Sequence, residues 1–144
     1  MDDVVELAAA LVAIPSVSGG EAAVVERIRA ELAAWGLAPA VSGRNVWCRV
    51  DGARGPGRTL LLQAHIDTVP ASAEWTREPW NAERRDGRLW GLGSNDTKGG
   101  AAAMIFATRA LAASRDFAGT LLFAATCDEE TGGQGLEALR PELP

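Results

Sequence analysis

Two stretches near the start of the chain place apolar side chains at the spacing of a helix. In residues 3–13 they recur every three or four positions, and Pro15 ends the pattern. A second amphipathic stretch ends at Gly36, a typical stop signal, and Ser18 with Glu21 ahead of it has the spacing of a capping box. The pattern therefore predicts two consecutive helices joined by a short loop.

Three apolar segments further along the chain predict β-strands. Residues 45–50 form a short one. Residues 59–64 and 119–126 are apolar without alternation, which is typical of strands that are covered on both faces in a parallel or mixed sheet. We therefore expect the strand at residues 59–64 to lie near the middle of that sheet.

The segments between and after these strands predict a hairpin and two more helices. Residues 83–90 have the pattern of a hairpin that turns on Asp86 and Gly87, residues 100–113 form an Ala-rich helix, and a last helix begins near residue 135. Strands that alternate with helices and short loops indicate an α/β layered fold with a largely parallel sheet. At 144 residues the chain has the length of one domain.

Composition narrows the classes of function. The chain is 47% hydrophobic, as expected of a globular protein with a core, and its net charge of −5 provides no basic stripe for nucleic acid. The start of the chain lacks the positive region of a secretory signal, and no apolar run is long enough to span a membrane. Cys48 and Cys127 are too few for a disulfide framework and form no C-x-x-C pair, so we expect a cytoplasmic location. We expect Cys127 to have a packing role.

The candidate chemistry gathers at the ends of the predicted strands. His65, the only histidine, and Asp67 follow one strand, and Glu129 and Glu130 follow another. Asp96 lies in a Gly-rich turn directly before the Ala-rich helix. Sites in open α/β sheets form at the carboxyl ends of strands, so we expect these five side chains to share one site.

Each motif also has a structural interpretation. His65 and Asp67 leave the same face of an extended segment, which suits a metal-binding imidazole oriented by a carboxylate, although a single buried histidine is more often structural. Asp96 fits either a helix N-cap or a carboxylate that faces two metal ions. Glu129 and Glu130 fit either a solvated acidic turn or a site whose crowded charge is compensated by a cation. Three such coincidences at three strand ends are much rarer than one, which favours a metal site.

Phosphate binding by the Gly-rich turn is disfavoured. The dinucleotide-binding pattern requires glycine where Asp96 stands. A P-loop requires serine or threonine directly after Lys98, where Gly99 stands.

At these residues the sequence resembles the metallo-aminoacylase and carboxypeptidase family that includes acetylornithine deacetylase, succinyl-diaminopimelate desuccinylase and glutamate carboxypeptidase. The matching strings are H-I-D-T-V-P at 65–70, W-T-R-E-P-W at 75–80, D-G-R-L-W-G-L-G-S-N-D-T-K-G-G at 86–100 and D-E-E-T-G-G at 128–133. Their order and approximate spacing hold across residues 59–133, which is far more specific than any one motif.

The resemblance implies a role for each candidate residue. His65 would ligate one metal ion, Asp96 would bridge two ions, and Glu130 would ligate the second. Asp67 would support His65 from behind, and Glu129 would be the general base. The metal would be Zn²⁺, two ions per complete site, with Co²⁺ or Mn²⁺ as substitutes.

The resemblance also implies a fold and an activity. The fold would be a three-layer αβα catalytic domain with a mostly parallel mixed sheet, and the peptide bond between Asp96 and Thr97 would be cis. The activity would be metal-dependent hydrolysis of an amide bond in a small N-acyl amino acid or peptide. The choice between deacylase and peptidase, the acyl group and the amino acid are not indicated by these residues.

Part of the family pattern has no counterpart in the chain. A later carboxylate and a histidine that complete the family's metal ligands are not found, and neither is the second, smaller domain that binds substrate and often makes a homodimer. We therefore expect residues 1–144 to be the N-terminal portion of a metallohydrolase catalytic domain, with weak metal binding and little or no turnover. A two-metal phosphoesterase and a catalytically silent interaction module are the alternatives.

Overall fold

Four strands form one mixed sheet in the computed structural model, which describes residues 3–143. Their order across the sheet is β1 (Ala40–Ser42), β2 (Asn45–Asp51), β6 (Thr120–Thr126) and β3 (Thr59–His65). β2 runs antiparallel to β1 and β6, and β3 runs parallel to β6. The expected mixed sheet is confirmed, but it is not mostly parallel, because among the described strands only β3 and β6 pair in parallel.

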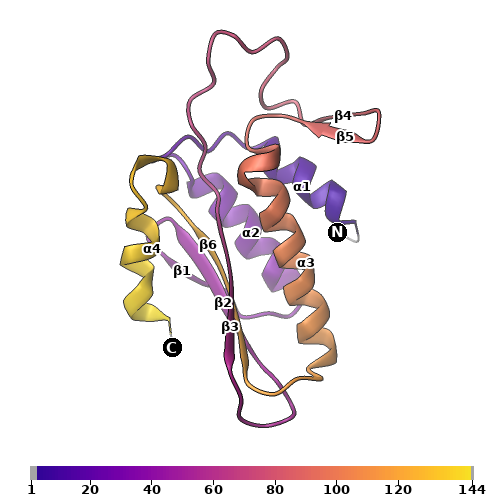
Figure 1. The fold of residues 1–144 in the computed structure, drawn as a ribbon, viewed down its shortest axis with the longest axis vertical. Helices are drawn as coiled ribbons and strands as arrows, with labels where there is room; N and C mark the ends of the chain where they lie inside the picture. The colour runs from indigo at the N-terminus through magenta and orange to yellow at the C-terminus, as the bar shows by residue number, and fades with distance from the viewer. Residues whose placement is uncertain (1–2, 144) are drawn as a thin grey trace.

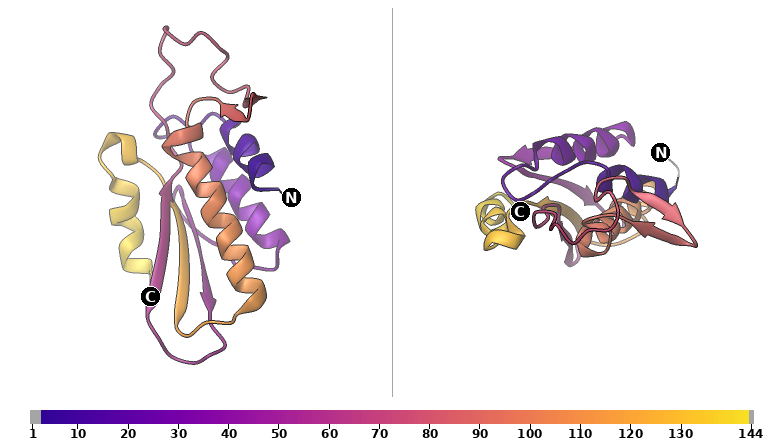
Figure 2. Two further views of the ribbon diagram at one scale, coloured as in Figure 1. Left: turned by 45° about the vertical axis from the view of Figure 1, so that its right-hand side comes forward. Right: turned by 90° about the horizontal axis from the view of Figure 1, so that it is seen from above.

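Helices cover both faces of the sheet and complete three layers. Helices α1 (Val4–Val12), α2 (Ala22–Ala34) and α3 (Gly99–Ser114) lie on one side, and α4 (Gln134–Leu139) lies on the other (Figure 1, Figure 2). The side-chain amide of Asn45 ties α4 to the sheet by donating to the carbonyl oxygen of Gly135 over 2.9 Å. The three-layer αβα architecture is therefore confirmed.

The main core lies between the sheet and the three helices on its first face. Val46 and Cys48 of β2 and Phe123 and Ala125 of β6 point into it, because alternate residues of a strand share a face. The helices contribute an apolar stripe that includes Leu7, Leu11, Val24, Ile28, Leu32, Ala102 and Ile105. This packing holds β3, β6 and the start of α3 in fixed relation.

Most predicted elements occur where the sequence placed them. The two early helices, the strands β2, β3 and β6, and the later helices α3 and α4 all form. The hairpin consists of β4 (Glu83–Arg85) and β5 (Arg88–Trp90), and Asp86 and Gly87 at its turn have φ angles of 53° and 72°. These positive values are those of a two-residue hairpin turn. The short strand β1 was not predicted.

The predicted central position of β3 is wrong for the described residues. β3 forms the edge of the sheet, and Leu60 and Leu61 are 55% and 40% exposed. Only its last residues, Ala64 and His65, are buried. An apolar run indicates that a strand is hydrophobic, but it does not fix the number of neighbouring strands.

The predicted capping box is also wrong. Helix α2 begins at Ala22 with Glu21 at its N-cap, so Ser18 does not cap it. The Ser18 hydroxyl donates instead to the carboxylate of Asp67 over 2.7 Å, and Glu21 accepts from the amide of Gly19. The Ser18 side chain therefore makes a long-range contact, and the Glu21 side chain closes the loop directly before the helix.

Within residues 3–143, none of the helices combines the length and apolar character needed to cross a bilayer.

Candidate metal centre

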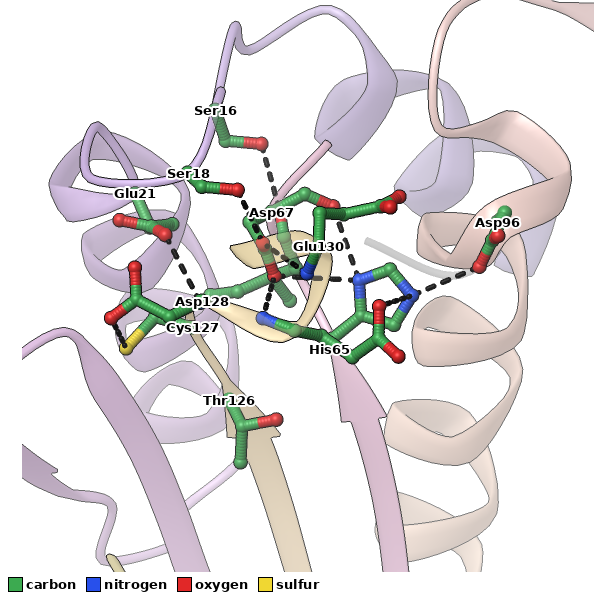
Figure 3. Close-up of polar contacts among 12 residues, drawn as sticks. Ser16, Ser18, Glu21, His65, Asp67, Asp96, Thr126, Cys127, Asp128 and Glu130 are labelled. Carbon is green, nitrogen blue, oxygen red and sulfur yellow. Dashed lines mark hydrogen bonds and ion pairs between the residues drawn. The ribbon is translucent and has the colours of Figure 1, made fainter. Parts of the chain in front are cut away.

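The candidate site lies where three segments meet at one end of the sheet (Figure 3). His65 is the last residue of β3, and it pairs in register with Thr126 at the end of β6. Because these strands are parallel, the residues that follow each one leave at the same edge. The turn Ser94–Lys98, which leads into α3, brings Asp96 to this edge.

The imidazole of His65 is held on both of its nitrogen atoms. Nε2 lies 2.9 Å from Oδ1 of Asp96. Nδ1 lies 3.2 Å from the backbone oxygen of Asp67 and 3.4 Å from its carboxylate. The His65 side chain is only 10% exposed, so the ring has a defined orientation with Nε2 directed toward the acidic side chains.

Three side chains have the arrangement of metal ligands. His65, Asp96 and Glu130 each offer one donor atom, and these atoms all lie within 4.8 Å of one another. One imidazole nitrogen and two carboxylate oxygens are donors that Zn²⁺ and similar divalent ions accept. The residues present therefore fit the metal that the family resemblance implies.

Glu129 stands beside this group rather than in it. Its Oε2 atom lies 3.9 Å from Nε2 of His65, and its side chain is 56% exposed. An accessible carboxylate next to the ligands has the placement needed to exchange protons with a molecule at the site.

Asp67 makes further contacts in the site besides the predicted one with His65. Its fully buried carboxylate accepts from the hydroxyl of Ser18 at 2.7 Å and from the backbone amides of Glu129 and Glu130, each at 3.1 Å. One carboxylate thus links the end of β3, the loop before α2 and the turn after β6. The two amide contacts were not predicted from the sequence.

The loop before α2 is aligned with the chain beyond β3 by its own backbone. Val17 and Thr68 form a parallel bridge, in which the Thr68 amide donates to Ser16 and the Ser18 amide donates to Thr68. The hydroxyl of Ser16 donates to the carbonyl oxygen of Ile66. These bonds place Ser18 next to Asp67.

The acidic surroundings set the protonation of His65. Burial of the ring lowers its pKa, but the hydrogen bond to Asp96 and the negative charges of Asp67 and Glu129 outweigh burial and raise the pKa overall. The acidic groups therefore make the imidazolium form more favourable than it is for a free imidazole, and a metal ion competes with a proton for this ring.

The turn that carries Asp96 is anchored by a buried lysine that sequence reasoning did not select. Lys98 is fully buried, and its ammonium donates to the carbonyl oxygen of Ile14 over 2.6 Å, 5.6 Å from the ring centre of Trp80. Burial lowers the pKa of Lys98 to about 8. The only local signal was that Lys98 is the single lysine of the chain.

The peptide bond between Asp96 and Thr97 is cis, as predicted.

Comparison with known proteins identifies the family of the chain. The model of peptidase family M20/M25/M40 matches residues 61–143. The match includes every candidate site residue and more than half of the chain, so the chain belongs to this family.

Solved structures share the fold at low sequence identity. An M20 family metallo-carboxypeptidase, Sso-CP2 from Sulfolobus solfataricus, has a TM-score of 0.85 and 21% identity over 100% of this chain and 36% of its own. Human carnosine dipeptidase 1 has a TM-score of 0.80 and 24% identity over 98% of this chain and 35% of its own. The Bacillus subtilis YXEP protein, a dinuclear metal binding peptidase from the M20 family, has a TM-score of 0.74 and 22% identity over 96% of this chain and 38% of its own. The chain thus spans little more than a third of the length of these proteins.

Proposed function

We propose that the chain is the N-terminal portion of the catalytic domain of a metal-dependent hydrolase that cleaves amide bonds. The observation that carries this proposal is the donor group of His65, Asp96 and Glu130, which come from three separate segments and converge within 4.8 Å. Membership of the M20/M25/M40 peptidase family supports it. The substrate and dimerisation domain and a C-terminal catalytic segment would belong to a longer parent enzyme.

The proposed metal is Zn²⁺, with two ions in the complete site and Co²⁺ or Mn²⁺ as substitutes. His65 would hold one ion, Glu130 the other, and Asp96 both. A bound ion of this kind supplies Lewis-acid polarisation of a carbonyl group and lowers the pKa of water. Asp67 keeps the His65 ring oriented through its contacts with Nδ1, as second carboxylates do for metal-binding histidines.

Glu129 is the proposed general base. Its carboxylate lies 3.9 Å from Nε2 of His65 and is exposed, so it can take a proton from an attacking water. The same carboxylate then returns a proton to the leaving amine. Proton transfer in this proposal therefore uses Glu129 as its only acid–base group.

The proposed substrate is a small N-acyl amino acid or a peptide. A cavity of about 370 Å³ adjoins the donor group, and both Asp96 and Glu130 contribute to its wall. The other lining residues include Thr68, Val69, Trp75, Leu92 and Asn95. This mixture of apolar surface and a few polar groups suits a small organic molecule.

Phosphoester hydrolysis is less well supported. A phosphate group would need a cationic partner close to the metal ligands. Lys98, the nearest cation in sequence to Asp96, is buried and directed to the carbonyl oxygen of Ile14. Its ammonium is therefore engaged away from the donor group.

We also propose a location for the chain and an oligomeric state for its longer parent. A cytoplasmic location is supported by Cys48 and Cys127, which are both free thiols. A homodimer of the longer parent is supported by the family resemblance alone.

The test combines metal binding by the chain with activity of the parent. Calorimetry with Zn²⁺ should show weak binding to the chain, which His65→Ala and Glu130→Ala abolish and Glu129→Gln retains. In the parent, Glu129→Gln should abolish hydrolysis of N-acyl amino acids and dipeptides while the metal content is unchanged. Metal binding that survives both ligand substitutions would contradict the proposed site, and unchanged hydrolysis would contradict the role of Glu129. Two tightly bound Zn²⁺ ions per chain would contradict the expectation that ligands are missing.

A further inference from the structure

A second charged cluster lies next to the donor group and involves the turn after β6. Glu21 comes from the start of α2, Arg44 from the turn between β1 and β2, and Asp128 from the segment after β6. Arg44 donates to Glu21 over 2.5 Å and to the two oxygens of Asp128 over 3.0 and 2.7 Å. The Glu21 side chain is fully buried and that of Asp128 is 15% exposed, so one guanidinium bridges two largely buried carboxylates.

This cluster acts on the backbone of the turn as well as on its side chains. Asp128 has a left-handed conformation with φ of 59°, and its amide donates to Glu21 over 3.3 Å. The preceding amide, of Cys127, donates to the side chain of Asn45 over 3.0 Å. The two following amides donate to Asp67.

Four consecutive backbone amides, those of residues 127–130, therefore each have a side-chain acceptor. The acceptors come from the start of β2, from the residue before α2 and from the segment after β3. The segment contains only one short 3-10 turn, at Glu129–Thr131, and such connections are normally among the more mobile parts of a protein. Here each backbone amide that leads into Glu129 and Glu130 is held by a hydrogen bond to a side chain.

We infer that Arg44 is a positioning residue for Glu129 and Glu130, acting through Glu21 and Asp128. Two carboxylates this close repel each other unless a cation lies between them. The planar fork of an arginine satisfies both oxygens of Asp128 and still reaches Glu21, which a lysine cannot do with the same geometry. By holding both acids, Arg44 keeps the turn in the conformation that directs Glu130 toward His65 and Asp96.

A metal ion in this second cluster is the competing interpretation. Glu21, Cys127 and Asp128 also offer donor atoms within 4.8 Å of one another. Arg44 already supplies the positive charge that the two carboxylates require. The thiol of Cys127 donates to Asp128 over 3.4 Å, and burial with this hydrogen bond raises the pKa of Cys127 to about 11, so the thiolate that a metal would need is disfavoured. Arg44, Glu21 and Asp128 therefore hold one another without a metal ion, and we call this group the clamp.

The test starts with amide hydrogen exchange in the metal-free chain, so that it does not depend on the proposed metal site. Arg44→Met should speed exchange at Glu129 and Glu130 by about tenfold or more, while the amide of Phe123 in the buried strand β6 reports global opening. The matched control is Arg49→Met, because Arg49 also pairs with a carboxylate, that of Asp51, at similar exposure but away from the turn. Arg49→Met should leave both amides unchanged.

Conservative variants keep the inference testable if Arg44→Met does not fold. Arg44→Lys retains the charge without the fork and should give intermediate exchange at Glu129 and Glu130. Exchange at these two amides that matches the unsubstituted chain in each Arg44 variant that folds would overturn the inference. Acceleration that is equal at Phe123 would also overturn it, because it would show a general loss of stability.

The metal-binding step rests on the proposed function and is scored separately. Arg44→Met should weaken Zn²⁺ binding by about tenfold or more, as changes behind metal ligands commonly do. If the unsubstituted chain and its parent bind no Zn²⁺, the proposed function fails, and hydrogen exchange still decides the role of Arg44. A thiolate-to-metal absorption band with Co²⁺ that disappears in Cys127→Ser would overturn the clamp in favour of a second metal site.

Discussion

The Nε2 atom of His65 lies 2.9 Å from a carboxylate oxygen of Asp96, although the two residues are 31 positions apart in the chain. The contact joins the end of β3 to the turn before α3. It is also unequal in exposure, because the His65 side chain is 10% exposed and that of Asp96 is 73% exposed. The buried ring is therefore part of the fold, whereas the carboxylate stands at the surface of the site.

This asymmetry predicts that Asp96→Asn separates metal binding from stability. The substitution keeps the shape and an oxygen that can accept from His65, but it removes the negative charge. Zn²⁺ affinity should fall by more than about tenfold, the lower end of the range for changes behind a ligand. Because the side chain is exposed, the free energy of unfolding should change by less than about 0.5 kcal/mol. Calorimetry and urea denaturation measure the two quantities.

Asp86→Asn is the matched control for Asp96→Asn. Asp86 is a similarly exposed aspartate in the hairpin turn, and its positive φ is one that asparagine adopts readily. Equal Zn²⁺ affinity in the two variants would remove Asp96 from the set of metal ligands.

The three hydrogen bonds that Asp67 accepts predict a large structural cost for its removal. Asp67→Ala leaves the amides of Glu129 and Glu130 and the hydroxyl of Ser18 without an acceptor, and the free energy of unfolding should fall by about 3 kcal/mol. Asp67→Asn retains one accepting oxygen and should cost about half as much. Urea denaturation gives both values. A cost for Asp67→Ala no larger than that for the exposed Asp51→Ala would show that these bonds do not stabilise the fold.

The elements of this fold were largely predictable because their signals are local. The apolar runs at β2 and β6 and the Asp86-Gly87 turn each specify a conformation within a few residues. The shared location of His65 and Glu130 also followed from their positions just after predicted strands, since residues that follow parallel strands leave at one edge.

The contacts that support the site were not predictable, because each joins residues far apart in sequence. Ser18 and Asp67 are 49 positions apart, and Arg44 and Asp128 are 84 apart. Neither pair leaves a periodic pattern, and the spacing of Ser18 indicated a helix cap instead. The edge position of β3 was missed for the same reason, since it depends on which strands pair and not on the composition of β3.

Lys98 shows the same limitation and leads to a third prediction. Its ammonium is buried against the carbonyl oxygen of Ile14, 84 positions away. Lys98→Ala removes the packed side chain and leaves that carbonyl group without its donor, so the free energy of unfolding should fall by about 3 kcal/mol. Lys98→Met keeps the volume without burying a charge and should cost less than about half of this.

Chemical modification of amines tests directly whether the Lys98 ammonium is buried. Lys98 is the only lysine, so an amine-reactive reagent can modify only this side chain and the N-terminal amine. Modification of Lys98 should be slow in the folded chain and fast in urea. Rapid modification without urea would show that the ammonium is not buried, and the stability predictions for both variants would then fail.

Cys48 in the core predicts a loss of stability at high pH. Burial raises the pKa of its thiol from 9.0 to about 11. Between these values the unfolded chain releases the proton and the folded chain keeps it, so the folded state binds more protons and becomes less stable as the pH rises. The contribution of this thiol is fully present below pH 9.0 and falls by about 1.4 kcal/mol for each pH unit toward 11.

Cys48→Ala isolates this effect, because all other titrating groups are common to both proteins. At pH 8 the variant should be less stable by about 1 kcal/mol, since it leaves a small cavity next to Phe123. The difference should shrink as the pH rises and reverse sign near about pH 10, because only the original chain must keep a buried thiol protonated. Urea denaturation across this range measures the difference. A gap that stays constant from pH 8 upward would show that the Cys48 thiol ionises as readily in the folded chain as in the unfolded one.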